Sequence, residues 1–228
     1  MSELAQHATE YDVVESEPPE ILGRNLVSAG HLLASSTAFF FLAFLFAYFY
    51  LRSLNNAHMW KPKHVDASVT WGTIVTACIV ASAVLVRFGL QDHRAERRNA
   101  WRTKGLLALA FGLATLVLQV VAWTQEGFGP SDGGFASVYF GWTAFLFLFV
   151  LATMFWLETV VATSIRYRGL SEGVRSVAPG EASGDPGREG EDIRDPVSLV
   201  RAELGSLSFY WTFLAGIGVL TWVVLYLL

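Results

Sequence analysis

Charged residues are scarce in this sequence. Only 16% of the 228 residues are Asp, Glu, Lys or Arg, and 53% are hydrophobic, whereas soluble proteins carry about 25% charged residues. The charges are also bunched, which leaves long stretches nearly free of them. A bilayer requires roughly 20 consecutive apolar residues for one helical crossing. Five stretches meet this requirement: 26–51, 69–90, 105–124, 137–163 and 206–228. The sequence therefore predicts an all-α membrane protein, a bundle of five transmembrane helices.

Cysteine is almost absent as well. The single cysteine, Cys78, lies inside the second predicted span, which excludes an internal disulfide and a cysteine-based metal or iron–sulfur site. The histidines are scattered over the tail, the first span and the loops, and no two share a helical face within a span, as a haem or copper site would need. There is no nucleophile–base pair, phosphate loop or dinucleotide fingerprint. We expect no catalytic residue, cofactor or metal in this chain, and no nucleic-acid partner.

Ionisable side chains inside the predicted spans are few. Such groups are costly in a bilayer and mark ion or proton routes where they occur. His31 and Glu158 lie within spans, and Arg87 lies near the end of one, where its long stem lets the charge reach the interface. Glu158 has two interpretations: an ion pair with Arg87 or Arg166, or a functional carboxylate. The middle of the membrane is predicted to be uncharged, which argues against a proton-coupled transporter.

Lysine and arginine are distributed unevenly between the two sides of the five spans. One side would hold only Arg52, Lys61 and Lys63. The other side would hold all the remaining basic residues: Arg24, Arg87, Arg94, Arg97, Arg98, Arg102, Lys104, Arg166, Arg168, Arg175, Arg188, Arg194 and Arg201. Because cytoplasmic loops retain Lys and Arg, we expect a cytoplasmic N-terminus and a periplasmic C-terminus.

The segments outside the spans differ in composition. Residues 1–25 are acidic, lack the basic start of a signal peptide and are predicted to form a cytoplasmic tail before the membrane domain of residues 26–228. Residues 91–104 read as a basic loop, and residues 164–205 as a flexible cytoplasmic loop. Within the latter, 171–196 is rich in Gly, Pro and acids and cannot fold alone. It is either a solvated linker or a docking segment for another subunit.

The first span carries many aromatic rings, and most spans carry small residues four positions apart. Phe39, Phe46, Phe49 and Tyr50 fall roughly on one face of the first span, which suits lipid or a broad partner surface. Ser35, Ser36 and Thr37 are expected to donate their hydroxyl protons to carbonyls one turn earlier. Small pairs permit close helix packing in lipid; they are Ala43 and Ala47, Ala77 and Ala81, Ala108 and Gly112, and Thr212 and Gly216. Trp60 and Trp71 are expected at the membrane interface.

Three stretches together resemble subunit III of the haem-copper (cytochrome c) oxidases, in its short five-helix bacterial form. "SSTAFFFLAFLFAYFYLR" (35–52) is similar to the helix that begins Ser-Glu and runs into Tyr-Phe and a basic residue. "GFASVYFGWTAFLFLFVLATMFWLETVVATSIRYRG" (134–169) resembles the Gly-Ser-x-Phe and Thr-Gly-x-His-Gly-x-His-Val signature. "SLSFYWTFLAGIGVLTWVVLYLL" (206–228) resembles the terminal Tyr-Trp-His-Phe helix. The motif positions are Ser36, Thr37, Phe40, Tyr48, Thr143, Val150, Tyr210, Trp211 and Phe213.

The chain departs from the family at every titratable motif position. The family carboxylate falls on Thr37, the two histidines of the second motif on Leu146 and Phe149, and the histidine and acid of the last helix on Thr212 and Ala215. A proton-related role of those groups therefore does not transfer to this chain. The packing residues remain, so the resemblance implies a scaffold role.

The resemblance implies a non-catalytic accessory subunit of a bacterial haem-copper terminal oxidase in the aerobic respiratory chain. Such a subunit would lie in the cytoplasmic membrane, contact subunit I directly and belong with subunit II and possible further respiratory complexes. Haem and copper would reside in those partners, and phospholipid would bind this chain near Arg87, Arg166 and Arg168. Three alternatives remain open: a subunit-III-like accessory protein of a nitric oxide reductase, a small-solute membrane transporter, and an autonomous membrane enzyme.

Overall fold

The computed structural model describes residues 19–55, 59–62, 65–95, 97–176 and 196–228. Within these ranges, the side chains of residues 19, 20, 22, 98 and 165–200 are not described. The described part is helical, with short connections and no strand. Five helices are long and apolar enough to cross a membrane. They are α2 (Pro19–Ser53), α3 (Val69–Arg94), α4 (Arg98–Gln125), α5 (Gly134–Ser176) and α6 (Pro196–Trp222), the last continuing into a π-helical turn, η2 (Val223–Leu227). The predicted five-helix membrane bundle is confirmed at this level.

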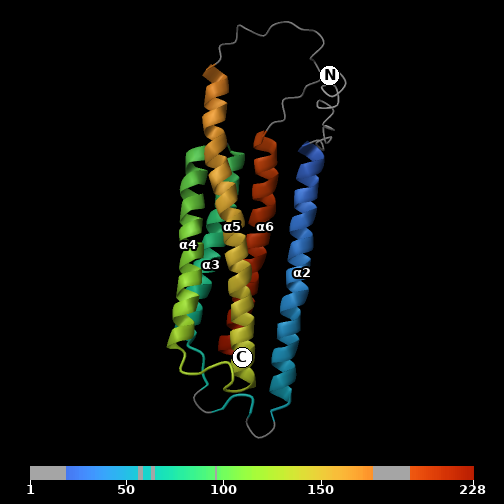
Figure 1. Cartoon of the computed structure of the whole chain (residues 1–228), viewed down its shortest axis with the longest axis vertical. Helices are drawn as coiled ribbons and strands as arrows, with labels where there is room; N and C mark the ends of the chain where they lie inside the picture. Colours follow the sequence, from blue (N-terminus) through green and yellow to red (C-terminus); the bar gives the residue numbers. More distant parts are fainter. Residues whose placement is uncertain (1–18, 56–58, 63–64, 96, 177–195) are drawn as a thin grey trace, which may run out of the picture.

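Helix α6 lies at the centre of the arrangement and α2 at its edge (Figure 1). Helices α3 and α4 form a tightly packed hairpin, and α6 packs against α2, α3 and α5. In the most apolar 18-residue stretch of α6, 50% of the residues are buried, compared with 22% in the corresponding stretch of α2. In Figure 1 the start of α2 lies at one end of the bundle, here called the N-terminal end, and the chain finishes at the other, the C-terminal end.

The connections at the C-terminal end pack together into a cap. The backbone N–H groups of Gly134 and Phe135 donate to the carbonyls of Met59 and Trp60. Gly133 adopts a φ of +140°, and a Cβ there would lie 2.7 Å from the Cδ of Pro62. Only glycine accepts both the backbone conformation and the close approach. Trp60 is buried by this cap, with its ring edge-on to Tyr48 and Phe135, so its ring contacts protein side chains.

The helices extend beyond the predicted spans. Helix α5 runs to Ser176 and α6 begins at Pro196, so the predicted flexible loop of residues 164–205 is helical at both ends; its middle, 177–195, lies outside the described residues. The predicted basic loop of residues 91–104 is also mostly helical, with only residues 95–97 connecting α3 to α4. Hydropathy identifies only the part of a helix that crosses the apolar core of a bilayer. The backbone hydrogen bonds of the helix continue beyond that part. The tail up to residue 18 lies outside the description.

Close packing depends on side chains lying against glycine more than on the predicted small pairs. Of the four pairs, Ala108 and Gly112 are both buried, whereas Ala43, Ala77, Thr212 and Gly216 are exposed. The ring of Trp101 lies on Gly89, and the ring of Tyr226 lies on Gly72. The small-residue pattern therefore located the packing faces of α4 alone.

Candidate functional site

Thr37 on α2 and Tyr210 on α6 form a buried hydrogen bond between helices. The two oxygens are 3.0 Å apart, and the residues are 1% and 2% exposed. The Thr37 hydroxyl donates its proton to the Leu33 carbonyl at 2.8 Å, so the Tyr210 phenol is the donor to Thr37. Ser35 donates in the same way to the His31 carbonyl, as predicted for these hydroxyls. Thr37, the position at which the resemblance places a carboxylate, is thus a neutral group that both donates and accepts a hydrogen bond.

A second set of buried hydrogen bonds joins α6, α3 and α4, and it begins at Trp211, the residue that follows Tyr210. The indole N–H of Trp211 on α6 donates to the Ser82 hydroxyl on α3 at 3.0 Å. Ser82 in turn donates to the backbone carbonyl of Ala108 on α4 at 2.7 Å. All three residues are fully buried. Ser82 therefore satisfies the indole and ties α3 to α4 without any charge.

Tryptophan-to-oxygen hydrogen bonds recur between the helices. The four further donor and acceptor pairs, each 3.0–3.2 Å apart, are Trp101 to Ser164, Trp123 to Thr143, Trp156 to Glu203, and Trp222 to Thr73. Interhelical hydrogen bonds within a membrane contribute about 0.6 kcal/mol each on average. Each of these bonds therefore stabilises the contact between its two helices only modestly. Trp142 differs from these five, since its indole nitrogen is buried and has no hydrogen-bond partner among the described residues.

Most motif positions lie in this network or in the core beside it. Six of the nine are buried: Thr37, Tyr48, Thr143, Val150, Tyr210 and Trp211. Phe40 and Phe213 are partly buried, and Ser36 is exposed. Tyr210 stacks on Phe213, whereas Tyr48 lies apart from them, against Trp60 at the C-terminal end. We use the name neutral seam for the connected set Thr37, Ser82, Tyr210 and Trp211.

The residues at the positions where the resemblance places histidines take part in packing. Phe149 lies with its ring 5.7 Å from the rings of both Phe40 and Phe41. Leu146 is partly buried against the cores at both ends of the bundle. Thr212 donates its hydroxyl proton to the carbonyl of Ser208 on its own helix. None of these side chains carries a charge.

The predicted ion pair between Glu158 and Arg87 is not formed. Both side chains are exposed, and they belong to α5 and α3, which make no substantial contact with each other. The side chains of Arg166 and Arg168 lie outside the described residues, so the alternative partner of Glu158 and two of the predicted lipid contacts do too. Among the described residues, Asp92 and Lys104 form a partly buried ion pair. Sequence reasoning missed it because residues 91–104 were interpreted as a loop.

Arg87 lies at a groove on the exposed side of α3 and α6. The groove has a volume of about 240 Å³. Its lining residues, apart from Arg87, are Val80, Ala83, Val84, Thr212, Ala215, Gly216 and Val219. The groove therefore offers an apolar surface to a lipid acyl chain and one guanidinium to the lipid phosphate.

Glu126 is the centre of a polar cluster at the C-terminal end. Its carboxylate accepts from the Ser68 backbone N–H at 3.1 and 3.3 Å and from the Tyr139 phenol at 3.1 Å. The Tyr139 proton goes to Glu126, so the neighbouring Tyr226 phenol, 3.1 Å away, donates to the Tyr139 oxygen. Burial raises the pKa of Glu126 above its ordinary value, although both hydrogen bonds act in the opposite direction. No sequence pattern pointed to this cluster, because Glu126 stands outside the predicted spans.

Two further observations bear on identity. In the described part of the chain, no three His, Cys, Asp or Glu side chains lie together in a group that could hold a metal ion. The chain matches no protein-family model, and no curated protein matches it in sequence.

Proposed function

We propose that this chain is a non-catalytic accessory subunit, of the subunit III kind, in a bacterial haem-copper respiratory oxidase. It would stabilise the haem-copper subunit and hold phospholipid in the cytoplasmic membrane, with its N-terminus in the cytoplasm. The observation that carries the proposal is the neutral seam. Motif positions from two separated stretches, Thr37 and Tyr210, meet in a buried contact, as residues of one shared scaffold should.

The chemistry of the seam supports a structural rather than a catalytic subunit. Its groups are hydroxyls, a phenol and an indole, each with its proton committed to a neighbouring oxygen. Such groups do not ionise near neutral pH, and they bring helices together without a cost of charge burial. This supports a structural contribution to a complex whose redox centres lie in another chain.

The outer face of α2 is the surface we propose for contact with the haem-bearing subunit. Phe39 and Phe46 are 74% and 69% exposed, and Phe46 stacks on the exposed Tyr50. These rings provide an apolar surface on α2, the helix at the edge of the bundle (Figure 1). Aromatic side chains are favoured at interfaces because they bury a large area with few rotatable bonds.

Purification of the full chain from its native membrane in a mild detergent tests the proposal. We expect a haem-bearing subunit to co-purify, seen in the reduced-minus-oxidised absorption spectrum and identified by mass spectrometry. Replacing Phe39 and Phe46 together by Ala should lower the amount of haem recovered. Replacing Leu113 and Val117, equally apolar and exposed on α4, should not. Recovery of the chain without any haem-bearing subunit would contradict the proposal.

The same preparation separates the closest alternative. An accessory protein of a nitric oxide reductase would also have neutral residues at the positions that Thr37, Leu146 and Phe149 occupy in this chain. The mass identification of the co-purified catalytic subunit distinguishes the two complexes.

A further inference from the structure

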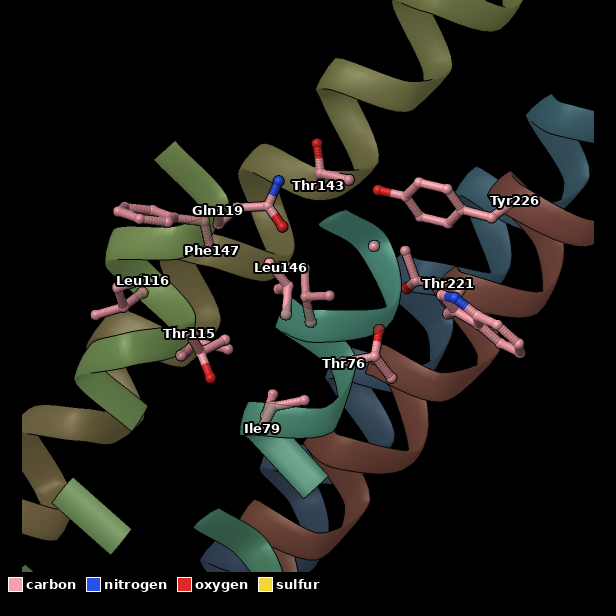
Figure 2. Close-up of a pocket in the computed structure, with 15 residues that line it drawn as sticks. Thr76, Ile79, Thr115, Leu116, Gln119, Thr143, Leu146, Phe147, Thr221 and Tyr226 are labelled. Atoms are coloured by element: carbon pink, nitrogen blue, oxygen red, sulfur yellow. The ribbon is translucent and has the colours of Figure 1, made fainter. Parts of the chain in front are cut away.

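A small cavity lies inside the bundle, towards the C-terminal end, with a mostly apolar wall into which several polar side chains project. It is lined by residues of α3, α4, α5, α6 and η2 and offers about 30 Å³ to water-sized molecules. Figure 2 shows its polar side chains around the space: Thr76, Thr115, Gln119, Thr143, Thr221 and Tyr226. These residues come from every helix except α2. None of the residues that line the cavity is charged.

Gln119 presents an unused hydrogen-bond donor to this cavity. Its side chain is 7% exposed, and its amide nitrogen has no partner among the described residues. Figure 2 shows the amide directed into the space between Thr143 and Leu146. A buried donor without a partner costs about 1–3 kcal/mol. The cavity therefore calls for a ligand that accepts a hydrogen bond from Gln119.

The hydroxyl groups of the cavity supply acceptors. Thr115, Thr143 and Thr221 each donate to a carbonyl one turn earlier on their own helices, at 2.9, 2.7 and 2.8 Å. The Tyr226 phenol donates to Tyr139 at 3.1 Å, because the Tyr139 proton is used by Glu126. The oxygens of these groups keep lone pairs that can accept. The ligand must therefore both accept from an amide and donate to hydroxyl oxygens, and it must be uncharged.

We propose that this cavity is a hydration site that holds a cluster of two or three water molecules anchored by Gln119. One water needs about 10–15 Å³ of such space and two to four polar partners, and the cavity provides both. Water is the smallest molecule that accepts from the amide and donates to the hydroxyls at once. The inference concerns the interior of this chain and is independent of the partner proposed above.

Tyr226 closes the cavity at the C-terminal end. Its ring lies against Gly72, where a Cβ would be 2.4 Å from the ring Cζ. It belongs to the π-helical turn η2, whose wider hydrogen bond runs from the Leu228 N–H to the Val223 carbonyl. Tyr226 also lines a larger pocket of about 310 Å³ with Tyr48, Arg52 and Lys61. The ring thus separates the cavity from that pocket, which gives water a route of exchange when the ring moves.

The opposite side of the cavity is apolar. Ile79, Leu116 and Val150 line it and belong to the same buried core as Leu157, Leu207 and Leu214. The water cluster therefore ends within the bundle and does not cross it. Hydration of this kind satisfies polar groups between helices without forming a path for protons.

Radiolytic labelling of the full chain in detergent tests the proposal. A short X-ray pulse makes hydroxyl radicals from water, so a buried side chain is oxidised only where water lies beside it. We expect Ile79 and Leu116, which line the cavity, to be labelled at least several-fold more than Leu157 and Leu214, which are also buried but lie away from it. Equal, background-level labelling of all four residues would mean a dry cavity and would overturn the proposal.

The variant Gln119→Leu tests the anchor. Labelling at Ile79 and Leu116 should fall to the level of Leu157, whereas Val117→Leu, on the exposed face of the same helix, should leave it unchanged. Full labelling in a folded Gln119→Leu variant would show that Gln119 does not hold the water. If that variant does not fold, the comparison of the four residues in the wild-type chain still decides between a wet and a dry cavity.

Discussion

The Tyr210 phenol on α6 donates a hydrogen bond of 3.0 Å to the Thr37 hydroxyl on α2, although the two residues are 173 positions apart. This contact joins the edge helix to the central one. A double-mutant cycle with Thr37→Val and Tyr210→Phe should give a coupling energy of about 0.6 kcal/mol, the average for such bonds in membrane proteins. The measurement is reversible unfolding in mixed micelles. Strictly additive effects of the two changes would show that the bond does not stabilise the fold.

Trp211 and Trp142 offer a matched pair for the tryptophan hydrogen bonds. Both are fully buried, but only Trp211 has a partner, the Ser82 hydroxyl. Replacing either by Phe removes a similar volume, while Trp211→Phe also removes a hydrogen bond and leaves Ser82 without its donor. We expect Trp211→Phe to lower the free energy of unfolding by about 1 kcal/mol more than Trp142→Phe does. Equal losses would contradict this account of the network.

Gly72 and Gly216 differ in the space beside them. A Cβ on Gly72 would lie 2.4 Å from the Tyr226 ring, whereas nothing lies within 4 Å of one on Gly216. Gly72→Ala should displace the ring and destabilise the fold by about 1–3 kcal/mol, as overpacking does. Gly216→Ala should be neutral or slightly stabilising, since alanine favours a helix. Thermal unfolding of the two variants checks the prediction, which fails if they melt alike.

Glu126 should make stability depend on pH in the acid range. Burial raises its pKa in the folded state above the ordinary 4.5, so the folded chain binds this proton more tightly than the unfolded chain does. The resulting stabilisation is complete below the unfolded pKa and is lost as pH rises through the raised folded value. Glu126→Gln should therefore remove part of the fall in melting temperature over that window. An identical pH profile in the variant would refute this assignment.

Arg87 should determine how much anionic phospholipid stays with the chain. The variant Arg87→Gln removes the one charge of the groove between α3 and α6. We expect mass spectrometry of the purified chain to find less bound anionic lipid and the same amount of zwitterionic lipid. Arg94→Gln, which changes an exposed arginine on the same helix outside the groove, serves as the control. Equal lipid content in both variants would separate Arg87 from lipid binding.

The sequence predicted the five-helix architecture because a bilayer imposes a long apolar run on each crossing. It also predicted that the hydroxyls of Ser35 and Thr37 would bond to their own helix, which is a local interaction. The bond from Tyr210 to Thr37 was out of reach, since it depends on how two distant helices rotate against each other.

The ion pairs were also out of reach of the sequence: the predicted pair of Glu158 and Arg87 is not formed, and the pair of Asp92 and Lys104 was missed. Glu158 and Arg87 were paired by their expected depth, but depth says nothing about which helices are neighbours. Asp92 and Lys104 face each other across a hairpin whose helices begin and end beyond the hydropathy limits. The small-residue pairs marked a buried packing face only on α4, because a face with small residues suits a helix, a ring or lipid equally well.

On the function proposed here, the bundle contributes packing and lipid contact, and the proposed partner subunit carries the redox centres. The most direct test is to dissociate the purified complex in a harsher detergent and record the visible spectrum and metal content of each separated chain. We predict that all haem and copper remain with the partner and that this chain absorbs only in the ultraviolet. Haem or a stoichiometric metal found on this isolated, folded chain would contradict the account.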